Sequence, residues 1–129
     1  MSDCLFCKIA KGELNSATIF ENNDFKVILD RYPSGRGHAL ILTKEHFDDL
    51  YQMDGETAGK LFALASIIAK ALKQATGCEG MNILQNNGEV AGQSIRHFHL
   101  HLILLKKTIQ LKTTLLLIWT YRLMIRKMK

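Results

Sequence analysis

Three histidines at alternate positions are the residues of this chain best suited to chemistry: the segment reads His97-Phe98-His99-Leu100-His101. Alternate side chains of an extended strand point to the same face, so the three imidazoles would line one side with about 7 Å between neighbours. Phe98 and Leu100 would then face a core. Because imidazoles titrate near neutrality, the row suits proton transfer, nucleophilic attack or metal binding.

A glycine-containing loop directly before the histidines supplies donors for an anion. It contains Gly88, Gly92, Gln93 and Ser94. Glycine lets the backbone approach an anion, and free amide N–H groups in such a turn can cradle phosphate. The side chains of Gln93 and Ser94 add an amide and a hydroxyl. Anion donors beside imidazoles indicate nucleophilic attack at phosphorus, with the middle histidine, His99, as the nucleophile.

This chemistry places one requirement on the His99 ring. One neutral imidazole nitrogen attacks phosphorus and forms a phosphoramidate, which water then hydrolyses. The other nitrogen must be held by an acceptor, so that the attacking nitrogen keeps its lone pair. Two other interpretations of the row stay open: a core strand with three hydrogen-bonded histidines, which are costly to bury, and a catalytic metal bound by all three.

A second group of residues indicates a metal. Cys4 and Cys7 form a C-x-x-C pair, and His46 follows a predicted strand. Two cysteines and two histidines satisfy tetrahedral zinc, and His97 could be the fourth ligand. It could not then act as a base, because the metal takes its lone pair. A redox pair and unliganded thiols are the alternatives, although no thioredoxin-like βαβ pattern surrounds the cysteines. Cys78 is expected to be an inert small residue.

The elements that position these residues follow from periodicity and turn signals. The clearest helix runs from Asp54, a capping residue, to Ala75, and Gly77 ends it. Its apolar positions follow helical spacing: Leu61, Leu64, Ala65, Ile68 and Leu72.

A short helix over 6–11 and five strands complete the expected fold. The strands are predicted over residues 18–21, 25–29, 39–42, 82–85 and 97–101. The first two strands are separated by an Asn-Asn-Asp turn and read as a hairpin. The order predicts an α+β domain in which a mostly antiparallel five-stranded sheet carries one long helix and a short N-terminal helix.

Composition favours one folded domain in a reducing compartment. The chain has 129 residues, of which 47% are hydrophobic, and three cysteines. The polar, acidic start is unlike a secretory signal, so we expect a cytoplasmic protein. The net charge of +5 is unevenly distributed: residues 1–101 carry −2, whereas residues 102–129 carry +7 and no acidic residue. The basic balance therefore does not make the domain a nucleic-acid binder.

Residues 104–129 differ in composition from the rest, since they lack Gly, Pro, Asp, Glu, Asn and His. The apolar run at 115–119 is too short for a membrane span, which needs roughly 20 residues. Three interpretations stay open: an ordinary final strand or helix, a membrane-surface or partner-binding segment, and a chain end not native to the domain, such as a shifted reading frame. We expect a domain over 1–103 followed by an atypical basic and apolar segment.

Residues 92–103 resemble the signature of the histidine triad nucleotide-binding proteins, in which three histidines alternate with apolar residues and two apolar residues follow. Weaker similarities occur at residues 4–9, 28–30, 37–41 and 82–88. The resemblance covers residues 3–103. It implies an α+β homodimer that hydrolyses or transfers nucleoside monophosphates from phosphoramidates, dinucleoside polyphosphates or nucleotidyl adducts, with a purine nucleotide as the expected substrate.

The resemblance also implies roles for particular residues. His99 matches the nucleophile, His101 the residue that contacts phosphate, and His38 a further active-site histidine. The expected nucleotide contacts are Gln93, Ser94 and Asn86 on the phosphate side, Asp30 on the ribose, and Ile9, Ile28 and Leu40 around the base. Asp30 could instead be a turn residue, and Ile9 and Leu40 plain core.

For the metal, the resemblance supports structural zinc on Cys4, Cys7, His46 and His97. After Ile103 the chain departs from the family pattern, which usually turns there. Three functions are therefore compared below: a nucleotide hydrolase or transferase, a nucleotide-binding regulatory module with little turnover, and a zinc-stabilised interaction domain.

Overall fold

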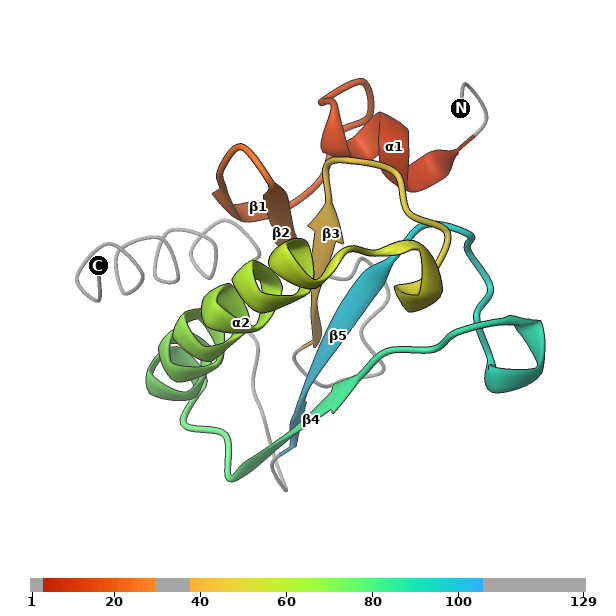
Figure 1. Cartoon of the computed structure of the whole chain (residues 1–129). Coiled ribbons are helices and arrows are strands. Elements are labelled where there is room, and N and C mark those ends of the chain that lie inside the picture. The colour runs from red at the N-terminus through yellow and green to blue at the C-terminus, as the bar shows by residue number, and fades with distance from the viewer. Residues whose placement is uncertain (1–3, 30–37, 106–129) are drawn as a thin grey trace.

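Five antiparallel strands form one sheet in the order β1-β2-β3-β5-β4 (Figure 1). The computed structural model describes residues 4–29 and 38–105. The strands are β1 (Thr18–Glu21), β2 (Phe25–Leu29), β3 (His38–Thr43), β4 (Gly80–Leu84) and β5 (His99–Leu105). The helices are α1 (Leu5–Ala10) and α2 (Gly55–Thr76), and two 3-10 turns occupy Leu50–Gln52 and Glu89–Ala91. The α+β fold expected from the sequence is confirmed.

The β1–β2 hairpin forms where the Asn-Asn-Asp turn predicted it. The Asn22 side-chain oxygen accepts hydrogen bonds from the backbone N–H groups of Asp24, at 2.9 Å, and Phe25, at 2.7 Å. A side chain that bonds its own backbone two residues on is the reason Asn favours turns. The two strands then pair antiparallel, with Glu21 opposite Lys26.

Helix α2 begins and ends at the residues that the capping signals indicated. Asp54 accepts a hydrogen bond from the Thr57 backbone N–H at 3.0 Å, and Gly77 adopts a left-handed conformation with φ of 67°. A left-handed residue at this position is favoured as glycine because it has no Cβ. The five apolar residues expected on its buried face are all buried.

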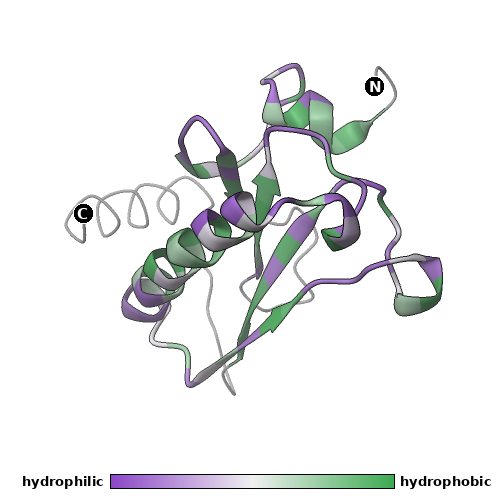
Figure 2. Cartoon of the chain, viewed as in Figure 1, coloured by the Kyte–Doolittle hydropathy of each residue, from purple (hydrophilic) through white to green (hydrophobic). Residues whose placement is uncertain are grey.

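The sheet has two differently covered faces. One face packs against α2 through residues such as Val27, Ile41, Leu100 and Leu102 and forms the main core. On the other face, Phe6 of α1 packs in a smaller cluster with strand residues from β2 and β3. Hydrophilic and hydrophobic residues alternate where β5 begins (Figure 2). The polar positions are the histidines, which therefore lie on the face that α2 does not cover.

The histidine strand differs from its prediction in two ways. His97 lies in a bend before β5, so the expectation of three imidazoles along one extended strand is wrong for the first of them. The strand also continues to Leu105, four residues past the predicted strand end at 101. Asp30 and residues 106–129 lie outside the described residues, so the proposals for them stay predictions. Neither described helix is long and apolar enough to cross a membrane.

Candidate active site and metal cluster

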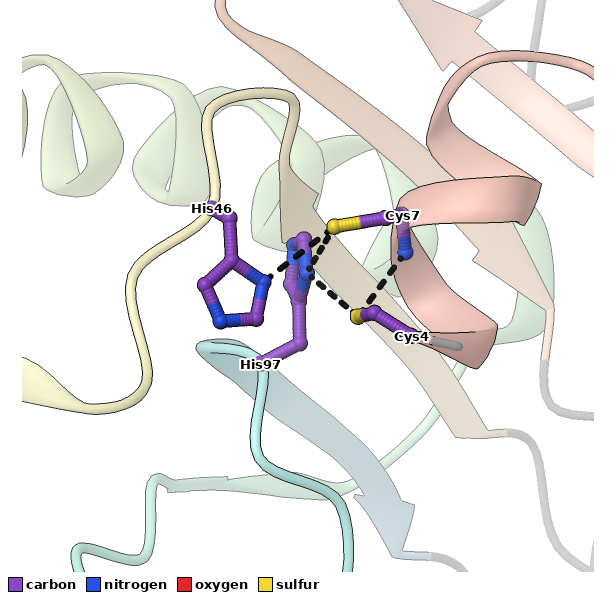
Figure 3. A group of neighbouring side chains, drawn as sticks. All are labelled: Cys4, Cys7, His46 and His97. Atoms are coloured by element: carbon purple, nitrogen blue, oxygen red, sulfur yellow. Dashed lines mark hydrogen bonds between the residues drawn. The ribbon is translucent and has the colours of Figure 1, made fainter. Parts of the chain in front are cut away.

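Four side chains from three separate segments converge beside α1 (Figure 3). Cys4 caps the helix and Cys7 lies within it, His46 follows β3, and His97 precedes β5. The Nδ1 atom of His97 lies 3.3 Å from the sulfur of each cysteine, and Nδ1 of His46 lies 3.2 Å from the Cys7 sulfur. We call these four residues the metal cluster, because the structure brings together the set that the sequence indicated.

The donor set and its spacing fit zinc. Tetrahedral zinc with bonds of about 2.3 Å to sulfur and about 2.0 Å to nitrogen places neighbouring ligand atoms roughly 3.5 Å apart. All four candidate ligand atoms lie within 4.8 Å of one another. Two thiolates and two neutral imidazoles would leave zinc with no net charge, which suits a site with two buried members, Cys7 and His97.

In both histidines of the metal cluster, Nε2 points away from the cysteines and has a hydrogen-bond acceptor. This determines which ring nitrogen carries the proton. Nε2 of His46 lies 2.7 Å from Asp48 Oδ1, and Nε2 of His97 lies 2.7 Å from the Thr43 carbonyl oxygen. Carboxylate and carbonyl oxygens only accept, so both Nε2 atoms carry the proton and both Nδ1 lone pairs point into the cluster. Metal-binding histidines are usually oriented in this way.

Burial shifts the pKa of two members of the metal cluster, His97 and Cys7. It lowers the pKa of His97 to about 4, so this imidazole is neutral at pH 7. Burial also raises the pKa of the Cys7 thiol, and the neighbouring Cys4 raises it further. A neutral His97 is ready to bind, whereas Cys7 must release a proton to become a ligand.

The remaining three histidines lie together on the sheet face that α2 leaves uncovered. Register places His99 of β5 opposite Leu42 of β3 and His101 opposite Leu40. Nε2 of His38 lies 2.8 Å from Nδ1 of His101. The rings of His99 and His101 are 4.8 Å apart between centroids. The structure thus groups the three histidines predicted to be catalytic.

His99 has the acceptor that nucleophilic attack requires. Its Nδ1 lies 2.7 Å from the backbone carbonyl oxygen of His97. That carbonyl can only accept, so the proton of His99 sits on Nδ1 and the lone pair on Nε2. The ring is also held by the edge of Phe6, with centroids 4.9 Å apart. A candidate metal ligand and the candidate nucleophile are therefore connected through one backbone carbonyl.

The three apolar residues expected around a base come together as well. Ile28 of β2 pairs with Leu40 of β3, which in turn lies opposite His101. Ile9 of α1 packs against the same small cluster and is half-buried. Ile28 and Leu40 are only 5% and 6% exposed, so Ile9 presents most of the apolar surface next to the histidines that a planar base could contact.

The loop expected to contact phosphate comes just before His97, the candidate metal ligand, in the chain. Gly88 and Gly92 have φ of 92° and 96°, which glycine adopts without strain. Ser94 is exposed and Asn86 half-buried. Gln93 is buried, with its oxygen accepting from the Gly88 backbone N–H at 2.8 Å and its nitrogen donating to backbone carbonyls. Its amide therefore holds the loop in shape.

Sequence reasoning missed the residues that orient others. Asp48 and Thr43 hold the two histidines of the metal cluster, and Phe6 packs against His99, the candidate nucleophile. Lys26, buried in β2, donates to the Ile9 carbonyl at 2.8 Å and anchors the end of α1. An acid two residues after His46 is a signal for Asp48. No local signal marks the other three, because each acts on a distant segment.

The comparisons with known proteins agree with this geometry. The HIT domain family matches residues 11–108. Protein hit of Bacillus subtilis is 38% identical over 101 residues, which cover 78% of this chain and 70% of that protein. Adenosine 5'-monophosphoramidase hnt1 of Schizosaccharomyces pombe is 36% identical over 78% of this chain and 72% of its own length. Adenylylsulfatase HINT3 of Arabidopsis thaliana is 37% identical, but this chain spans only 52% of it.

Solved structures show the same fold. A hypothetical histidine triad nucleotide-binding protein from Sulfolobus tokodaii superposes with a TM-score of 0.91 and 30% identity, covering 98% of this chain and 94% of that one. A zinc-bound histidine triad family protein from Mycobacterium smegmatis gives a TM-score of 0.86 and 29% identity, covering 98% and 96%. With the family match and the relatives above 30% identity taken together, the chain belongs to the HIT domain family, the histidine triad proteins.

Proposed function

We propose that this chain is a nucleotide hydrolase or transferase that cleaves nucleoside phosphoramidates through a nucleotidyl-His99 intermediate. The observation that carries the proposal is the 2.7 Å contact between His99 Nδ1 and the His97 carbonyl oxygen, which directs the Nε2 lone pair toward a substrate. The names of two relatives, an adenosine 5'-monophosphoramidase and an adenylylsulfatase, support bonds between an adenylyl group and a nitrogen or oxygen leaving group.

The first step forms one bond to phosphorus and breaks another. The Nε2 lone pair of His99 attacks phosphorus, and the phosphorus–nitrogen bond of the phosphoramidate breaks as the amine leaves with a proton from water. The ring becomes cationic in the intermediate, and the His97 carbonyl oxygen stabilises it through Nδ1–H. Covalent catalysis of this kind divides one difficult displacement into two easier ones.

Water then attacks the same phosphorus, the bond to Nε2 breaks, and the nucleoside monophosphate leaves with restoration of neutral His99. His101 lies beside the nucleophile and is oriented by His38, so it is the group we assign to the phosphate oxygens. Ser94 and Asn86 are proposed on the phosphate side. Dinucleoside polyphosphates fit the same scheme with a nucleotide as the leaving group.

The remaining contacts define the nucleoside. We assign the apolar surface formed by Ile9, Ile28 and Leu40 to a purine base, since a larger ring system covers more apolar area. Asp30, whose two acceptor oxygens suit ribose hydroxyls, is proposed for the sugar.

We propose that the metal cluster holds structural zinc. Zinc there would join α1 to the segments that carry His46 and His97, and it would take no part in proton transfer. The zinc-bound relative from Mycobacterium smegmatis supports this assignment. Metal analysis of the purified protein tests it: about one zinc per chain is expected, and a marked loss in Cys7→Ser.

We also propose a homodimer. Among the described strands β4 lies at one edge of the sheet, and its Ile83 and Leu84 are 43% and 44% exposed. An edge strand with exposed apolar residues is a site at which a second copy can pair. Light scattering should give twice the chain mass, and a monomer at all concentrations contradicts the proposal.

A substrate panel on the purified protein tests the activity. Adenosine and guanosine phosphoramidates and a diadenosine polyphosphate are compared, with His99→Ala as the variant. We expect turnover with at least one substrate and its loss in His99→Ala, while AMP binding persists. Retention of most hydrolysis in His99→Ala contradicts the mechanism. Binding without turnover favours the regulatory module, and zinc without nucleotide binding favours the interaction domain.

A further inference from the structure

Asp48 lies between the metal cluster and the phosphate-side loop, residues 86–94, and it bonds to both. Its carboxylate Oδ1 is 2.7 Å from Nε2 of His46. Its backbone carbonyl accepts a hydrogen bond from the side-chain nitrogen of Gln93. One residue therefore holds a candidate metal ligand with its side chain and the loop with its main chain.

Gln93 completes the connection. It is 7% exposed, and its oxygen accepts from the Gly88 backbone N–H at 2.8 Å. Its nitrogen also donates to the Ile95 carbonyl at 3.0 Å. Both N–H groups of the amide thus point at backbone carbonyls, one of them in the segment that carries His46. The amide acts as a cross-link between two stretches of chain.

A second bond ties the same two stretches together. The Leu50 backbone N–H donates to the Asn87 side-chain oxygen at 2.8 Å, and Asn87 in turn bonds Gln85 at 2.8 and 2.9 Å. The segment after His46 is therefore attached to the loop at two points, Asn87 before the turn at Glu89–Ala91 and Gln93 after it. Fixing the orientation of that segment fixes the loop.

We propose that Asp48 and Gln93 are positioning residues that couple metal binding at the cluster to the affinity of the loop for a nucleotide phosphate. This inference rests on the proposed function. Nδ1 of His46 would bind the metal, which would fix an imidazole that bonds the Asp48 carboxylate, and the Asp48 carbonyl accepts from Gln93. Loop amides ordered in advance lose less entropy when they bind phosphate, which is how preorganisation raises affinity.

The coupling is a property of binding and is measured without turnover. AMP affinity is determined by calorimetry for the zinc-loaded and chelator-stripped protein, with circular dichroism as a check on folding. We expect zinc to tighten AMP binding roughly tenfold, within the usual range for linked sites. AMP should tighten zinc binding by the same factor, because linkage is reciprocal. In Gln93→Ala the ratio of AMP affinity with zinc to AMP affinity without zinc should fall toward one.

Variants kept saturated with zinc test the same coupling without the stripped protein. Asp48→Ala, with its zinc content verified, should bind AMP several-fold more weakly. Asp48→Asn keeps an oxygen acceptor and should recover most of the affinity. Gln52→Ala is the matched control. The side-chain oxygen of the exposed Gln52 accepts from the Asp48 backbone N–H at 2.8 Å, and its nitrogen donates to Asp48 Oδ2 at 3.4 Å, whereas Nε2 of His46 bonds the other carboxylate oxygen, Oδ1. Gln52→Ala should bind AMP as the wild type does.

The outcomes separate this inference from the proposed function. Equal AMP affinity with and without zinc overturns the coupling and leaves the function standing. An equal loss of affinity in Gln93→Ala in both metal states also overturns it, because it identifies Gln93 as a direct ligand contact. Wild-type protein that binds no AMP in either state overturns both.

Discussion

The Nε2 atom of His38 on β3 and the Nδ1 atom of His101 on β5 lie 2.8 Å apart, although the residues are 63 positions apart in sequence. The pair is possible because the two strands are neighbours, with Leu40 opposite His101. It means that the orientation of His101 depends on a residue outside the histidine motif.

Replacement of His38 should therefore slow catalysis without preventing binding. His38→Ala frees the His101 ring to rotate, and we expect kcat to fall roughly tenfold or more with AMP affinity within about twofold, since misplaced catalytic groups cost mainly rate. Steady-state kinetics beside AMP titration measure both. His38→Gln keeps a side-chain amide near His101 and should recover part of the rate. An unchanged kcat in His38→Ala removes His38 from the site.

The apolar surface formed by Ile9, Ile28 and Leu40 should bind the base equally well in the ground state and in the transition state. Ile9→Ala removes half-buried apolar area from α1, and we expect KM to rise about fivefold to tenfold at constant kcat. Leu5→Ala on the same helix is the control, because Leu5 is 46% exposed and absent from the cluster around Leu40. A fall in kcat with unchanged KM in Ile9→Ala would show that α1 acts on the nucleophile and not on the base.

The metal-free protein should lose stability as pH falls from about 6.5 to about 4. Burial lowers the pKa of His97 from 6.5 to about 4. Between these values His97 is protonated in the unfolded chain but neutral in the folded one. The free energy of unfolding therefore decreases with decreasing pH. Urea titrations with a chelator present measure it. In His97→Asn, whose absolute stability will differ, the slope over this range should be smaller; an equal slope contradicts the assignment.

Gly59, within α2, and Gly77, which caps its C-terminus, should respond in opposite directions to substitution by alanine. Gly77→Ala places a Cβ on a residue with φ of 67° and should lower the free energy of unfolding by about 1 kcal/mol. Gly59→Ala lies in the exposed part of the helix with open space around the new Cβ, and should raise it by up to about 1 kcal/mol. Urea denaturation distinguishes them, and stabilisation by both would contradict the helix C-terminus described above.

Local signals predicted those parts of the fold that local physics determines. The hairpin strands Thr18–Glu21 and Phe25–Leu29 have the predicted bounds, since Asn22 forms the turn by itself. The α2 ends followed from Asp54 and Gly77. The departure at His97 could not be read from alternation, because the Thr43 carbonyl and the two cysteines, all distant in sequence, turn its ring out of the strand.

In the site, too, some features follow from local sequence and others depend on contacts between distant segments. Motif spacing grouped the histidines and the metal cluster correctly, because type and spacing carry that information. The roles of Asp48 and Gln93 depend on a contact between segments 45 residues apart, which only the sheet topology creates. In the structure the Gln93 amide bonds backbone groups, and its contact with phosphate stays a prediction.

Trapping of the covalent intermediate tests the central claim most directly. The protein is mixed with an adenosine phosphoramidate, quenched at high pH, where nucleotidyl-histidine bonds should survive, and examined by intact and peptide mass spectrometry. The account predicts an added adenylyl group on the peptide that contains His99, and none in His99→Ala. Turnover by the wild type with no adduct at any time point, or an adduct on another residue, would contradict it.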